Sequence, residues 1–120
     1  MNRIFQQTWH IPGTLAADVA IQFTAPCNLT LLHASLVSGN SAAAGVKVGT
    51  SADDDKFLAL CSSGVSGTPV EKERPDFAGG QYPRIADGEV VAIAVDYDYN
   101  GGGAGSSSAD LTIVLTFAEG

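Results

Sequence analysis

The chain has 120 residues and a mass of 12.3 kDa, which is the size of one domain. Hydrophobic residues make up 45% of it and charged residues 16%, so we expect a packed core rather than a disordered chain. Thirteen acidic and six basic side chains give a formal net charge of −7, a balance that opposes binding to the phosphates of DNA or RNA.

The N-terminal segment, residues 1–13, mixes polar residues with two aromatic ones. It lacks the apolar stretch of a secretory signal, and no segment has the roughly 18 consecutive apolar residues that cross a membrane. We therefore expect synthesis in the cytoplasm and free thiols at Cys27 and Cys61, with one disulfide between them as the alternative. Residues 1–13 are predicted to form an arm or a first strand, and residues 14–120 a single β-sandwich domain.

Apolar residues recur with a period of two along most of the chain, which predicts strands. Residues 19–24 alternate in this way until Pro26, which cannot donate a ladder hydrogen bond. The doubled leucine within residues 29–37 predicts either a bulge or a strand covered on both faces. A short strand follows at residues 46–48. Residues 53–61 fit a helix and a strand equally well.

The two clearest strands lie at residues 90–98 and 111–117. Residues 100–108 between them contain mainly glycine and serine, so we predict a mobile loop that closes a long C-terminal β-hairpin. Short strands separated by turn signals every 8–12 residues are typical of an antiparallel sandwich or barrel. The predicted fold is all-β, an antiparallel β-sandwich that is jelly-roll-like and has about eight strands.

Residues suited to catalysis or metal binding are scattered. His10 and His33 lie in no ligand-spaced cluster, and we expect both to be packed or surface side chains. Residues 53–55 are three aspartates without the spacing of a calcium loop, which favours a solvated loop over a calcium site. Three more carboxylates flank the last two strands: Asp96, Asp98 and Asp110. We expect these to be exposed strand-end residues, with a shared site as the alternative, and we predict no enzymatic activity, no metal and no cofactor.

Residues 69–84 are the best candidate for a contact surface, because they hold three of the six basic residues, several prolines and two aromatic rings. A plain connecting loop is the alternative. The segment 3–11 is the second candidate, since it could complete a sheet edge or add to a neighbouring subunit. Aromatic and arginine side chains are enriched at interface cores. The candidate contact residues are Phe5, Trp9, Phe77, Tyr82 and Arg84.

Residues 88–98, the glycine-rich loop and residues 109–120 together resemble the end of many small virion proteins of tailed bacteriophages, and residues 47–55 resemble another segment of them. The resemblance implies a jelly roll of the capsid decoration, or cement, type that binds the major capsid protein without catalysis. It also implies synthesis in the host cytoplasm, a place on the capsid surface of the virion, and a homo-oligomer, either a trimer or a dimer. Contact with nucleic acid or membrane is not expected.

A carbohydrate-binding or receptor-binding sandwich, such as a tail or fibre component, is the alternative function. Such a module would use exposed aromatic rings as platforms on which sugars stack. The rings available for this are Trp9, Tyr82, Tyr97 and Tyr99. An enzyme ranks third, because a fold class by itself implies no reaction.

Overall fold

The computed structural model describes residues 3–99 and 106–120. The strands in these residues are β1 (Ile4–Thr14), β2 (Val19–Thr24), β3 (Leu29–Val37), β4 (Gly45–Thr50), β5 (Leu58–Ser62), β6 (Val70–Lys72), β7 (Arg84–Ile85), β8 (Val90–Asp96) and β9 (Ala109–Glu119). Two 3-10 turns, η1 (Arg74–Asp76) and η2 (Ala78–Gly80), lie between β6 and β7. Within the described residues, no helix combines the length and apolar character needed to span a bilayer.

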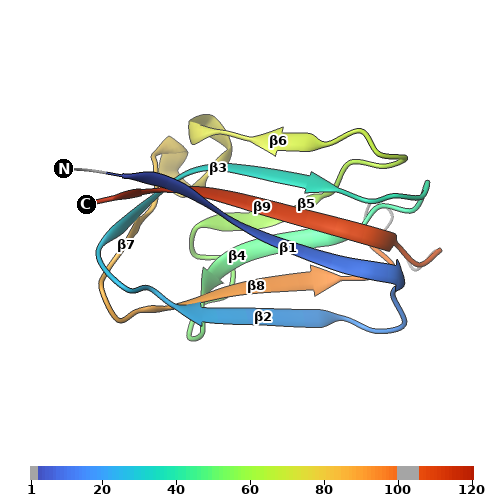
Figure 1. Ribbon diagram of the computed structural model, residues 1–120, viewed down its shortest axis with the longest axis horizontal. Helices are drawn as coiled ribbons and strands as arrows, with labels where there is room; N and C mark the ends of the chain where they lie inside the picture. The colour runs from blue at the N-terminus through green and yellow to red at the C-terminus, as the bar shows by residue number, and fades with distance from the viewer. Residues whose placement is uncertain (1–2, 100–105) are drawn as a thin grey trace.

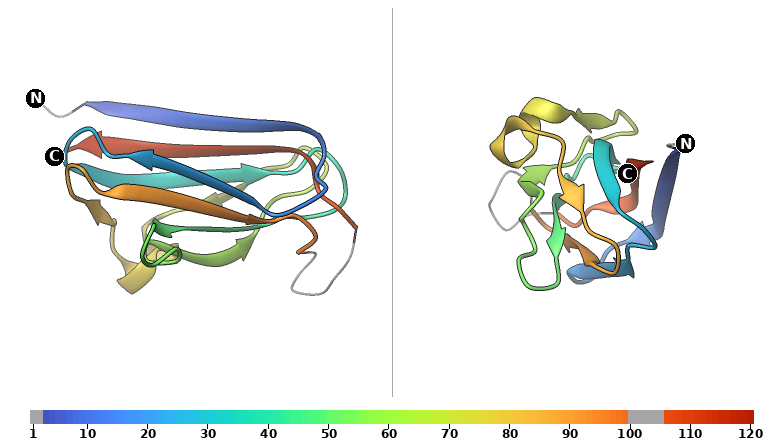
Figure 2. Two further views of the ribbon diagram at one scale, coloured as in Figure 1. Left: turned by 90° about the horizontal axis from the view of Figure 1, so that it is seen from below. Right: turned by 90° about the vertical axis from the view of Figure 1, so that its left-hand side faces the viewer.

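The strands form two antiparallel sheets that pack as a sandwich (Figure 2). One sheet has the order β1-β9-β3-β6, with β7 also paired to β3, and the other has the order β2-β8-β4-β5. The pairs are nested along the chain, because the first strand pairs with the last and the second with the last but one (Figure 1). β6 and β7 pair with opposite ends of β3 and share one position in the sheet. Nested pairing over eight positions is the jelly roll, so the predicted fold class is confirmed.

The predicted C-terminal hairpin is wrong. β8 pairs with β2 and β4, whereas β9 pairs with β1 and β3 in the opposite sheet. Alternating apolar residues give each strand one buried face, but both sheets of a sandwich bury their faces in the same core, so the pattern cannot tell the two sheets apart. Residues 100–105 of the predicted mobile loop lie outside the described residues, while Ser108 is buried and its amide donates to the carbonyl of Tyr97 at 2.9 Å.

The core fills the space between the sheets with aliphatic side chains and three phenylalanines, Phe57, Phe77 and Phe117. Its largest fully buried members are Phe117, Leu29, Leu31, Leu36, Leu58, Ile85, Ile93, Leu111, Ile113 and Leu115. The register between β3 and β9 shifts between Leu31 and His33, which confirms the bulge predicted at the doubled leucine. Residues 58–62 form a strand rather than the helix that the sequence also allowed, because β5 pairs with β4.

Candidate functional site

The two N-terminal contact candidates face the interior of the sandwich. Phe5 packs on Phe117 with ring centroids 5.6 Å apart, and Trp9 stacks on Phe23 of β2, also at 5.6 Å. Since β1 and β2 belong to different sheets, these rings close one open side of the sandwich, called the β1/β2 side below. Both rings remain half-buried, so they present only their rims to a partner.

Phe77 lies in the core, with 3% of its surface exposed. Its backbone is held as well, because the amide of the next residue, Ala78, donates to the carbonyl of Phe57 at 3.0 Å. In the preceding turn, the amide of Glu73 donates to a carboxylate oxygen of Asp76 at 3.0 Å. Phe77 is therefore the internal anchor of the segment between β6 and β7, and its ring is not available to a partner.

Tyr82 is 45% exposed and lines an open hollow of about 640 Å³ beside β3, called the Tyr82 hollow below. Its other lining residues are Leu32, His33, Glu73, Arg74 and Pro75. Arg74 was not among the contact candidates predicted from the sequence. Its signal was available, since it is one of the few basic residues of the chain and immediately precedes a proline. The hollow joins apolar, aromatic and charged groups on one ordered surface.

Arg84 belongs to a different hollow, of about 390 Å³, at the end of the molecule where β7 meets β3. An ion pair between Lys56 and Glu89, 3.8 Å from nitrogen to oxygen, lies beside it. The five predicted contact residues therefore do not form one patch. Two close the β1/β2 side, one anchors the core, and two line separate hollows.

A third hollow, of about 390 Å³, lies on the outer face of the β2-β8-β4-β5 sheet. Small side chains leave this space open, notably Ala20 and Ala94. Leu60 forms an exposed apolar wall, and Lys47 pairs with Asp54 at 3.3 Å.

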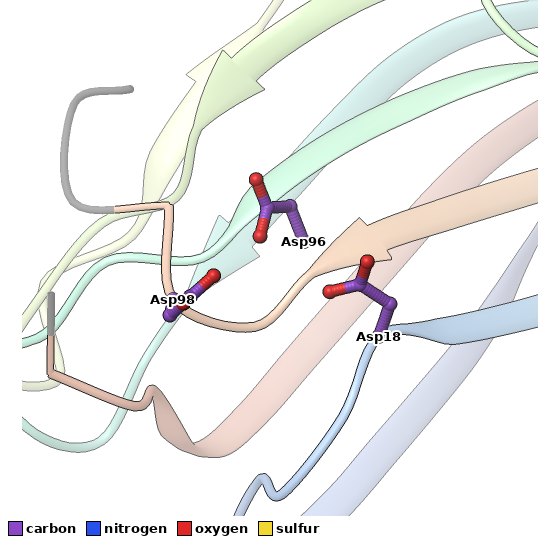
Figure 3. A group of neighbouring side chains, drawn as sticks. All are labelled: Asp18, Asp96 and Asp98. Atoms are coloured by element: carbon purple, nitrogen blue, oxygen red, sulfur yellow. The ribbon is translucent and has the colours of Figure 1, made fainter. Parts of the chain in front are cut away.

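Three carboxylates meet at one end of the third hollow: Asp18, Asp96 and Asp98 (Figure 3). One oxygen of each lies within 4.8 Å of the others, and the amide of Tyr97 donates to Asp18 at 3.2 Å. Asp110, which the sequence grouped with Asp96 and Asp98, lies apart from them and accepts a hydrogen bond from the amide of Gly13 at 2.8 Å. Asp18 was missed because it is distant in sequence and joins the group only through the pairing of β2 with β8.

Partial burial and a hydrogen bond with Asp98 raise the pKa of Asp96. Crowded carboxylates of this kind could accept a cation, as could the exposed group at residues 53–55. Asp18 and residues 53–55 are exposed, whereas Asp96 and Asp98 are half-buried, and exposed acidic groups are common without any bound ion. These carboxylates offer oxygen atoms that could coordinate a cation, but by themselves they do not define a cation site.

The remaining polar candidates are involved in local contacts. His10 shares a hydrogen bond of 2.9 Å with Thr112, and His33 lies 3.7 Å from a carboxylate oxygen of Glu71. Cys27 and Cys61 are free and half-buried against the core. Burial raises the pKa of the Cys61 thiol, which keeps it protonated and a poor nucleophile at neutral pH.

No protein-family model and no curated protein sequence matches the chain. Among solved structures, the chain is similar to a chain of the cyanophage Pam1 capsid asymmetric unit, with a TM-score of 0.58 and 16% identity over 99% of this chain and 85% of that one. It is also similar to a chain of infectious bursal disease virus, Gx strain, with a TM-score of 0.39 and 11% identity over 98% of this chain and 32% of that one. A family two carbohydrate esterase from Cellvibrio japonicus gives a TM-score of 0.38 and 13% identity, over 99% and 34%. The first of these likenesses shows a shared fold.

Proposed function

We propose that the chain is a non-enzymatic structural protein of a phage virion, a decoration or cement protein that binds the outer surface of the major capsid protein. The observation that carries the proposal is the likeness in fold to a chain of the cyanophage Pam1 capsid, which covers 99% of this chain and 85% of that one. Jelly rolls serve many functions, so the fold alone would not be sufficient. The resemblance of residues 88–98 and 109–120 to tailed-phage virion proteins predicts the same class of protein, and the support for that class comes from the fold.

The Tyr82 hollow is the surface that we assign to the capsid. It combines an exposed tyrosine, Arg74 and the apolar surfaces of Leu32 and Pro75, a mixture that is enriched in protein interfaces. Because Phe77 anchors the same segment in the core, the hollow is ordered before a partner binds. An ordered surface loses less conformational entropy on binding, which lowers the free-energy cost of association.

The charge of the chain favours the outside of a shell over its inside. A net charge of −7 would repel packaged DNA, whereas on the outer surface it helps to keep particles apart in solution. The proposal therefore includes a virion location on the capsid surface, synthesis in the host cytoplasm, and assembly as a homo-oligomer. It includes no role for nucleic acid, membrane, metal or cofactor.

The alternative, a saccharide-binding or receptor-binding tail module, has less support. It needs exposed rings, but Trp9 stacks on Phe23 and Tyr97 packs against the core. The ring of Tyr99 lies against Gly45, where an added Cβ would come within 2.7 Å of it. Of the four rings, Tyr82 is the one with a large exposed surface, and a single ring is a weak sugar platform.

A binding assay on phage particles that lack this protein tests the proposal. The wild-type chain should bind such particles at many sites, and Tyr82→Ala combined with Arg74→Ala should weaken binding about tenfold or more. Leu60→Ala is the matched control, because Leu60 is 43% exposed against 45% for Tyr82 but lies on the opposite sheet. No binding by the wild-type chain, together with strong binding to one glycan on an array, would replace the capsid proposal with the tail-module alternative.

A further inference from the structure

β1 is a long sheet edge whose residues 4–11 lack the usual protection, while Pro12 and a register shift between Ile11 and Thr14 protect its C-terminal end. It spans 11 residues at the edge of its sheet, beside β9, and the register is regular from Ile4 to Ile11. Natural proteins protect such edges with charged side chains, short strands or bulges, because an open row of backbone donors and acceptors recruits another strand. β1 contains no aspartate, glutamate, lysine or arginine, and Ile4 at its start is 70% exposed.

The opposite edge of the same sheet shows the protection that β1 lacks. There β6 and β7 are three and two residues long and carry Glu71, Lys72 and Arg84. β2, which lies against β1 through the contact between Trp9 and Phe23, also has no charged residue. The β1/β2 side is thus a neutral surface on a chain of net charge −7, so two copies can approach there with little repulsion.

We propose that β1 pairs antiparallel with β1 of a second copy, about a twofold axis at Thr8. This axis uses all of the regular part of the strand except Ile4, since residues 5–11 are symmetric about Thr8. It places Phe5 opposite Ile11 of the second copy and Gln6 opposite His10. An antiparallel edge is complementary to itself, so one strand supplies both halves of the interface. The two four-stranded paths then form one continuous sheet of eight strands.

The charges at the two ends of β1 favour a second copy over an unrelated strand. Arg3 is 78% exposed on its side chain and is 4.0 Å from its nearest partner, Glu119. Continued beyond Ile11, the register brings Arg3 near Gly13 of the second copy, whose amide points toward β9 and donates to the carboxylate of Asp110 at 2.8 Å. Arg3 of each copy is therefore separated from Asp110 of the other by the width of one strand, and the opposite charges of this pair, which occurs twice in the dimer, attract each other. Ile4 meets Pro12 in the same way, which covers its exposed side chain.

The dimer rests on the proposed function in one respect only, the expectation of a homo-oligomer. Its test needs no phage particle. Light scattering and sedimentation of the isolated chain over a dilution series should show conversion from twice 12.3 kDa to 12.3 kDa. Exchange of those amides of residues 4–11 that point away from β9 should slow as the dimer forms, because only these amides gain a partner in the second copy. Failure here leaves the capsid-binding assay unaffected.

Thr8→Glu supplies the matched variant, because it places two like charges directly opposite each other and should weaken the dimer about fivefold. Thr116→Glu is the control. It adds the same charge on the neighbouring strand, opposite Gln6 and so away from the axis. In the dimer the two added charges would be about 20 Å apart, three strand spacings across and four residues along, which is beyond the screening length in 0.15 M salt. A monomer at every concentration would overturn the proposal, as would a dimer whose residues 4–11 exchange as fast as in the monomer. A monomer whose β1 amides become protected only on particles would assign the edge to the capsid instead.

Discussion

The two long sides of the sandwich are built in different ways. On the β1/β2 side, regular edge strands turn their aromatic rings inward and expose neutral residues and an open backbone edge. On the other side, short strands and 3-10 turns between residues 70 and 85 expose Tyr82 and Arg74 around a hollow. A regular edge thus offers its backbone to a partner, whereas specific side chains are exposed where regular pairing stops.

The largest effect that we predict is on the free energy of unfolding, and it distinguishes Phe77, the internal anchor of the segment between β6 and β7, from the exposed Tyr82. Phe77→Ala should lower the free energy of unfolding by about 3–4 kcal/mol, because it removes a buried ring and leaves a cavity. Tyr82→Ala, on the same segment, should lower it by well under half as much, since its ring is 45% exposed. Denaturant unfolding of both variants checks this, and equal losses would contradict the assignment of Phe77 as the anchor.

Trp9→Ala tests the aromatic closure of the β1/β2 side. We expect a loss of about 2 kcal/mol in the free energy of unfolding, because the ring is half-buried and stacks on Phe23 at 5.6 Å. The loss should be smaller than that of Phe77→Ala. Thr8→Ala is the control on the same strand, and its effect should fall within about 0.5 kcal/mol of zero since Thr8 is exposed. A Trp9 variant as stable as the wild type would show that the ring closes nothing.

Cys61 provides a third, chemical comparison. Because burial raises its pKa, alkylation by iodoacetamide in a Cys27→Ser background should be slower at pH 8 than that of a free cysteine in a peptide. The rate should keep rising with pH beyond the point at which the peptide rate levels off. Mass spectrometry of the labelled fraction over time measures both rates, and a Cys61 that reacts faster than the peptide would refute the prediction.

The smallest effect concerns the carboxylates at the end of β8. A raised pKa means that the folded state binds a proton at Asp96 more tightly than the unfolded state does, so this contribution to stability is present at low pH and is lost as pH rises through the folded pKa. Asp96→Asn should therefore be slightly more stable than the wild type at pH 7. Below pH 3.8, the ordinary pKa of an aspartate, this gain in stability should disappear. Melting temperatures between pH 3 and 8 check this, and a variant less stable at pH 7 would have the wrong sign.

The sequence predicted those features of the fold that depend on local pattern. Period two gave the strands, and the doubled leucine at Leu31 located the bulge of β3. The partner of each strand was not predictable, because the nested pairing joins β1 to β9 and β2 to β8 across most of the chain. Alternation contains no information about which distant strand will lie alongside, and the predicted hairpin failed for this reason.

The same distinction between local pattern and strand pairing applies to the candidate site residues. Tyr82 was selected because aromatic and arginine side chains, which this proline-interrupted segment combines, are enriched at interface cores. The same signal selected Phe77, which the segment uses as its anchor. Burial cannot be distinguished from exposure for a single ring outside a periodic pattern. Asp18 joins Asp96 only once β2 lies beside β8, with Val19 opposite Val95. Its place follows directly from the register but not from the sequence.

The proposal that this chain coats a phage capsid is tested most directly by counting its copies per particle. Quantitative mass spectrometry of purified particles should give a copy number comparable to that of the major capsid protein. A count of only a few copies per particle would move the chain to the tail or fibres, and its absence from the particles would contradict the account.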